Sequence, residues 1–144
     1  MPGVDNYTQE YVDRCRSRLA EQVGMYNALI AAARSQARDR AQVEAAIEQF
    51  EHHFFTNMVL ALDSFFVHRA RALEKKDGNP LNEVRMLCDS ITTNDGTMAL
   101  DETIKVDPVK SVLKYRAGDK IKLNEADFIL LSSGFFAEIE AKYL

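Results

Sequence analysis

The side chains best suited to binding an anion fall within residues 68–85, a stretch that joins two predicted helices. Arginine binds phosphate and carboxylate groups through paired hydrogen bonds, and asparagine amides supply further donors. Histidine can donate or accept a proton near neutral pH. This combination makes the stretch a candidate anion site centred on His68 and Arg69. The candidate ligand-binding residues are His68, Arg69, Arg71, Asn79, Asn82 and Arg85.

The same stretch could instead form a buried network of ion pairs. Helical spacing draws His68 and Arg69 toward the interior, where an unpaired charge is costly. Asp63, Glu74 and Glu83 are available as partners. The sequence leaves both alternatives open, because it does not show whether these side chains converge on open space or on one another.

The sequence lacks the motifs of common metal sites and enzymes. His52 and His53 are neighbours that point in different directions on a helix, and His68 would lie about 22 Å from His53 along the same helix. Zinc and di-iron sites need ligands that converge from suitable spacings or from several helices. Phosphate-binding glycine loops and nucleophile motifs are also missing. We therefore predict no metal and no cofactor and favour a protein that is not an enzyme; any catalytic residues are unknown.

The hydrophobic pattern predicts a mainly α-helical protein, an elongated four-helix-type bundle in a single domain over residues 1–144. The first helix is expected to begin after Asn6 as its N-cap. Its end is poorly marked, and we place the break at residues 35–39 because Asp39 and Gln42 resemble a capping box.

The phenylalanine-rich stretch 40–76 is predicted to be one continuous helix. Between Phe54 and Val67 it is apolar nearly all round, which is typical of a helix covered on every side by other elements or by a second subunit. It would be about 55 Å long, whereas a compact domain of this size is about 37 Å across. The mismatch predicts an elongated bundle or association with another chain, and we favour a homodimer.

Two further helices are predicted in the C-terminal half. Asn79 and Pro80 are suited to the start of one helix, which should end before Gly96. Asn124 is the predicted N-cap of the last, with Asp127 in its first turn. Between them, residues 97–123 are expected to form a small β-hairpin or an irregular segment. The hairpin is suggested by apolar and basic residues that alternate on both sides of residues 116–119.

Composition and charge restrict the range of partners. Of the 144 residues, 47% are hydrophobic and 28% are charged, and the net charge is −4, so a general attraction for nucleic acid or an anionic membrane is disfavoured. Residues 105–122 are locally basic, but on a hairpin such residues usually form the solvated face. The uncharged run 22–33 is shorter than the roughly 20 residues that span a bilayer. Without a signal-peptide pattern, and with only Cys15 and Cys88, we expect a soluble, cytoplasmic protein.

These observations lead to two functional hypotheses. The first is a non-enzymatic helical-bundle module that self-associates or binds a protein partner through its aromatic-rich helix. The alternative is a protein or enzyme that binds a small phosphate or carboxylate at His68 and Arg69. Neither the ligand nor a partner's identity follows from the sequence.

Overall fold

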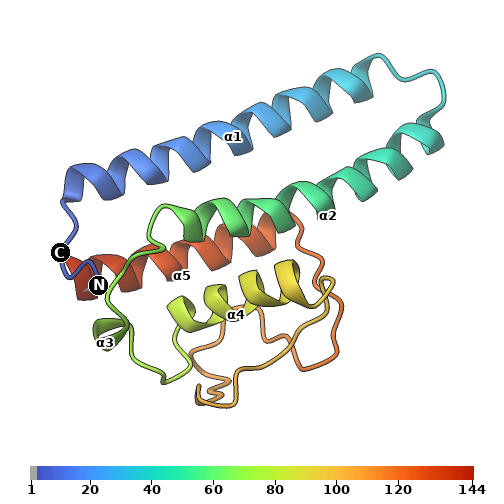
Figure 1. The fold of residues 1–144 in the computed structure, drawn as a ribbon. Helices are drawn as coiled ribbons and strands as arrows, with labels where there is room; N and C mark the ends of the chain where they lie inside the picture. The colour runs from blue at the N-terminus through green and yellow to red at the C-terminus, as the bar shows by residue number, and fades with distance from the viewer. Residues whose placement is uncertain (1–2) are drawn as a thin grey trace.

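The computed structural model describes residues 3–144 and confirms a mainly α-helical bundle (Figure 1). Four longer helices and one short helix make up the described chain: α1 (Gln9–Ser35), α2 (Arg40–Ser64), α3 (Arg71–Glu74), α4 (Pro80–Thr93) and α5 (Glu125–Tyr143). β-Structure within residues 3–144 is limited to two isolated bridges, Val4–Arg69 and Thr97–Lys120.

Helices α1 and α2 form a long antiparallel hairpin whose tip projects beyond α4 and α5 (Figure 1). The predicted break at residues 35–39 is confirmed, because Asp39 caps α2 by accepting a hydrogen bond from the Gln42 N–H at 3.1 Å. The N-cap of α1 is Thr8, which accepts from the Tyr11 N–H at 3.0 Å, and the prediction of Asn6 was wrong. Asparagine and threonine are both residue types that cap helices, so residue type alone did not identify the N-cap.

The prediction of a continuous helix over residues 40–76 was wrong, because α2 ends at Ser64. Two tight turns follow: the Phe66 N–H donates to the Asp63 carbonyl at 3.0 Å, and the Arg69 N–H donates to the Phe66 carbonyl at 3.1 Å. The chain then leaves the helix direction and re-forms only the single turn of α3. No glycine or proline marks this end in the sequence.

The N-terminal segment holds the chain in this changed direction. The Val4 N–H donates to the His68 carbonyl at 2.7 Å, and the Ala70 N–H donates to the Val4 carbonyl at 2.8 Å. Gly3 permits this close approach, because a Cβ atom there would lie 2.6 Å from the Ala70 Cα. A contact between residues far apart in sequence therefore accompanies the end of α2.

The hydrophobic core lies between the C-terminal part of α2, α4 and α5, with α1 packed alongside. Helix α2 buries Phe55, Met58, Val59 and Leu62 in this core. Other elements of this chain do not cover the stretch 54–67 on every side, because Val67 is 48% exposed, and Phe50 just before the stretch is 42% exposed. The projecting half of the hairpin has only two helices, so one side of α2 has no neighbour there.

Helix α4 begins as predicted, with Asn79 as N-cap and Pro80 in the first turn. Gly78 precedes the cap with φ 87°, a left-handed conformation that favours glycine. A Cβ atom on Gly78 would also lie 2.6 Å from the Lys105 carbonyl oxygen. The turn into α4 is therefore packed tightly against the segment that follows the helix.

Residues 97–123 form the irregular segment, and the predicted hairpin around residues 116–119 is not formed. Lys114 has φ 60°, and the side chain of Glu83 accepts hydrogen bonds from the N–H groups of Val112 and Leu113 at 2.7 and 2.8 Å. These contacts with α4 replace the strand pairing that the alternation suggested. The observed pairing joins Thr97 to Lys120 instead.

Helix α5 closes the bundle and follows the sequence prediction. Asn124 and Asp127 form a reciprocal capping box at its start. The helix buries one face in the core, with Phe128, Leu131, Phe135, Ile139 and Tyr143.

Candidate functional site

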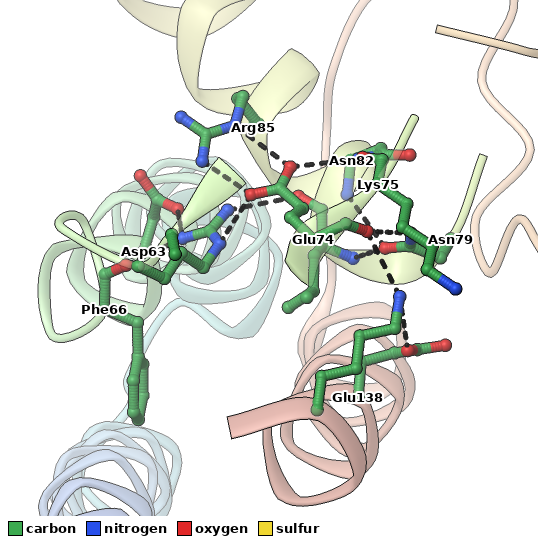
Figure 2. Close-up of polar contacts among 12 residues, drawn as sticks. Asp63, Phe66, Glu74, Lys75, Asn79, Asn82, Arg85 and Glu138 are labelled. Carbon is green, nitrogen blue, oxygen red and sulfur yellow. Dashed lines mark hydrogen bonds and ion pairs between the residues drawn. The ribbon is translucent and has the colours of Figure 1, made fainter. Parts of the chain in front are cut away.

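The predicted anion site contains a carboxylate of the protein itself, Glu74, at its centre (Figure 2). The Glu74 side chain is fully buried. It accepts hydrogen bonds from Arg69 Nε at 2.8 Å, from Arg85 Nε and Nη2 at 3.1 and 2.6 Å, and from Asn82 Nδ2 at 2.9 Å. Arg85 thus binds Glu74 with two parallel bonds, the geometry with which arginine would bind an external carboxylate.

Each nitrogen of the Arg69 guanidinium also donates to a group of the protein. Besides its bond to Glu74, Nη1 donates to Asp63 Oδ1 at 2.8 Å and to the Phe66 carbonyl at 3.0 Å. Nη2 donates to the Leu81 carbonyl at 3.3 Å. The side chain is completely buried, and these partners lie at the end of α2 and the start of α4.

The cluster is balanced in charge. Two guanidinium groups, Arg69 and Arg85, face two carboxylates, Asp63 and Glu74. Burial acts to raise the pKa of Glu74, but the hydrogen bonds and charges of Arg85 and Arg69 outweigh it and hold this pKa below its usual range. The hydrogen bond to Glu74 correspondingly raises the pKa of Arg85. A fully ionised, neutral network results, with no excess positive charge for an external anion.

The two asparagines of the predicted site hold the loop before α4. Asn79 Oδ1 accepts from the N–H groups of Leu81 and Asn82, and its Nδ2 donates to the Glu74 carbonyl at 2.8 Å. Asn82 Oδ1 accepts from the Gly78 N–H at 2.9 Å. Both amides therefore have structural partners, and across residues 3–144 no buried side-chain polar atom lacks a hydrogen bond.

His68 and Arg71 do not join this cluster. Both are exposed, and His68 contributes only its backbone carbonyl, to Val4. The expectation that His68 is drawn inward was wrong, because α2 ends before it and its helical register is lost. The structure thus brings together Arg69, Asn79, Asn82 and Arg85 around Glu74, and this geometry favours the ion-pair alternative.

A groove between α1 and α2, with a volume of about 770 Å³, was not predicted from the sequence. Tyr26 lies in its floor, stacked on Phe54 with ring centroids 5.0 Å apart. Burial and then the charge of Glu51 raise the pKa of Tyr26 to about 12, so its phenol is neutral. The lining residues are Arg18, Glu21, Gln22, Met25, Tyr26, Leu29, Phe50, Phe54 and Phe65.

Large apolar side chains border this groove and remain exposed to water. Met25 is 64% exposed and Leu29 is 58% exposed, and both face the groove from α1. Phe50 faces it from α2. Met25 and Leu29, which lie four residues apart in the first helix, were the signal in the sequence for this surface.

Comparison with known proteins supplies no further assignment: no protein-family model, curated protein or solved structure matches this chain. Within residues 3–144, no helix is both long and apolar enough to cross a membrane. The described part of the chain also contains no group of three or more histidine, cysteine or acidic side chains arranged to hold a metal ion.

Proposed function

We propose that this protein is a non-enzymatic helical module that self-associates through the groove between α1 and α2. The observation that carries the proposal is the exposure of Met25, Leu29 and Phe50 along one aromatic-floored groove. Isolated exposed apolar residues are common on proteins, but several that line one groove are typical of an interaction surface. Aromatic and methionine side chains are also enriched in the central part of protein interfaces.

The spacing of the groove residues suits a helical partner. On α1 they recur at steps of four, three and four residues: Arg18, Gln22, Met25 and Leu29. This is the spacing with which helices in bundles interdigitate. A two-helix surface of this kind can accept a further helix or a second two-helix layer.

A second copy of the chain is the partner that we propose. Two hairpins packed face to face complete a four-helix arrangement with two-fold symmetry, the commonest symmetry of small oligomers. The rim of the groove carries Arg18 and Glu21, which form no ion pair within residues 3–144. Because these two charges have opposite signs, the rims of two identical copies carry no net charge that would repel each other. The tip of the hairpin also projects beyond α4 and α5 (Figure 1), and Met25 and Leu29 in the groove are exposed.

Light scattering on purified wild-type protein and on groove variants tests this proposal. We expect a dimer for the wild type and a monomer for Phe50→Asp and for Met25→Glu, since a buried unpaired carboxylate is strongly disfavoured at an interface. Val109→Asp is the matched control: Val109 is 92% exposed and lies outside the groove, so this variant should remain dimeric. A monomeric wild type at every accessible concentration, or a dimer that both groove variants retain, would refute self-association through this surface.

A further inference from the structure

A second hollow, lined mainly by polar residue types, lies between α2 and the irregular segment. Its volume is about 370 Å³, and its lining includes His52 and His53 from α2, Asp95 from the turn after α4, and Lys120 and Lys122 from the segment before α5. An adjoining hollow shares His52, His53 and Lys122. We call these five residues and the space between them the polar cleft. It is separate from both the Glu74 cluster and the α1–α2 groove.

The two lysines of the polar cleft form no ion pair within residues 3–144, in contrast to Lys110 and Lys142. Lys110 is paired with Asp77 at 3.0 Å, and Lys142 is paired with Glu138 at 3.1 Å. Within the described chain, neither Lys120 nor Lys122 has a carboxylate within ion-pair distance. Their ammonium groups therefore remain available to an anion from solution, whereas the arginines of the Glu74 cluster do not.

The backbone fixes these lysines on the cleft side of the segment. Ile121 and Leu123 are buried in the core, so the residues that alternate with them project outward. The Ile121 N–H donates to the Gly96 carbonyl at 2.8 Å, and the Lys122 N–H donates to Tyr115 Oη at 3.1 Å. The lysine backbones are thus held in place although their side chains are exposed.

Both histidines face the lysines from α2. His52 Nδ1 lies 3.3 Å from the Leu123 carbonyl oxygen, so a proton on Nδ1 is donated to this acceptor and orients the ring. His53 is exposed beside it. Asp95 adds one carboxylate to the cleft, and Glu48 lines the adjoining hollow. A bare anion is repelled by these carboxylates, but the hydroxyl groups of a larger ligand can donate hydrogen bonds to them.

We infer that the polar cleft binds a small organic anion that also carries hydroxyl groups. Lys120 and Lys122 bind its phosphate or carboxylate group, with an imidazole donor from His53. Asp95 accepts a hydrogen bond from a ligand hydroxyl. The volume of the cleft lies at the small end of the range for ligand pockets, which suits a compact metabolite. This inference does not depend on self-association, since none of the cleft residues lines the α1–α2 groove.

Titration of the purified protein with four probes at low ionic strength tests the inference. Glycerol 3-phosphate and malate each combine an anionic group with a hydroxyl, inorganic phosphate lacks the carbon-bound hydroxyl groups, and glycerol lacks the charge. We expect one or both of the first two to bind with an affinity on the order of millimolar and more tightly than inorganic phosphate, and glycerol not to bind. Which of the two binds decides between a phosphate and a carboxylate ligand.

The double variant Lys120→Ala/Lys122→Ala locates the binding. It should weaken the affinity on the order of tenfold or more, while Lys76→Ala/Lys105→Ala, which removes the same charge from exposed positions outside the cleft, should not. Circular dichroism verifies that both variants fold. Absence of binding by glycerol 3-phosphate and malate at 10-fold higher concentrations than expected would overturn the inference. An equal loss in both double variants would overturn it too, because it would show a non-specific effect of charge.

Discussion

Around Glu74 each buried charge has a partner inside the protein, whereas along the α1–α2 groove large apolar side chains have no neighbour to cover them. The Glu74 cluster joins the end of α2, α3 and the start of α4 through hydrogen bonds among buried groups. The groove leaves Met25, Leu29 and Phe50 in contact with water. Residue types alone would have favoured the Glu74 cluster as the binding site, because arginine, histidine and asparagine are the types associated with binding sites.

The comparison shows that side chains without partners inside the chain identify a binding surface better than residue types do. In the Glu74 cluster two cations meet two anions, and a further ligand would have to displace one of them. Along the groove a partner would displace only water from apolar surface, which is favourable by about 25 cal/mol for each Å² buried. The polar cleft is intermediate, with lysines that have no ion-pair partner within the described residues.

The largest predicted effect concerns the buried cluster. Glu74→Ala leaves Arg69 buried with only one of its two carboxylate partners and removes two hydrogen bonds from Arg85. Breaking a buried pair from one side typically costs about 3–5 kcal/mol of the free energy of unfolding, and urea denaturation measures it. Glu10→Ala removes an exposed ion pair with Arg14 and should cost less than about 1 kcal/mol. Similar losses in the two variants would show that the cluster is not a structural anchor.

Glycine substitutions extend the comparison to the backbone. Gly78→Ala, beside the cluster, introduces a side chain at positive φ and against the Lys105 carbonyl, and should destabilise the protein by about 1–3 kcal/mol. Gly24→Ala, on the hairpin, meets no atom within 4 Å and should stabilise helix α1 by about 0.5–1 kcal/mol. Thermal unfolding of both variants should therefore shift in opposite directions. A lower melting temperature for Gly24→Ala would mean that the outer face of α1 is already occupied.

Acid should lower the stability of the protein through Asp77, which lies in the loop before α4. Burial acts to raise the pKa of Asp77, but hydrogen bonds from Lys110 and Asn79 dominate and lower this pKa to about 2. A carboxyl with a lowered folded-state pKa stabilises the protein above its unfolded-state pKa of about 4, and this stabilisation is lost as the pH falls through the folded-state value. Urea midpoints for wild type and Asp77→Asn should therefore differ at pH 6 and converge between about pH 4 and pH 2. A constant difference across this range would contradict the assignment.

At the groove a small loss of stability is expected. Phe50→Asp loses contacts with Tyr26 and Phe54, at ring-centroid distances of 6.0 and 5.7 Å, but Phe50 is already partly exposed. At a protein concentration where the chain is monomeric, it should lower the free energy of unfolding by less than about 1.5 kcal/mol. A loss as large as that of Glu74→Ala would mean that Phe50 is a core residue of the monomer.

The parts of the fold that local chemistry determines were predictable from the sequence. Asn79 with Pro80, Asp39 with Gln42, and Asn124 with Asp127 are capping patterns within a few residues, and each begins a helix where predicted. The end of α2 at Ser64 was not predictable in this way, because it coincides with backbone pairing to Val4 from the other end of the chain. For the same reason the hairpin was overpredicted, since Glu83 on α4 binds the N–H groups that strand pairing would have used.

For the candidate site, the sequence predicts which side chains interact more reliably than it predicts how they are arranged. Asp63 and Glu74 were foreseen as partners of Arg69, because buried guanidinium groups require carboxylates. The position of His68 was missed, since it depended on a helical register that ends before it. The α1–α2 groove was missed because the sequence does not show whether a third element covers Met25 and Leu29.

Hydrogen exchange measured at increasing protein concentration tests the contrast between the two regions most directly. If the groove is where two copies meet, backbone amides of residues 18–29 and 50–61 should exchange more slowly as the concentration rises, since association raises the free energy of local opening at the interface. Amides of residues 74–85 should change less, and Phe50→Asp should abolish the dependence. Exchange along α1 and α2 that is independent of concentration, in a sample that light scattering shows to be dimeric, would place the contact elsewhere and contradict the account.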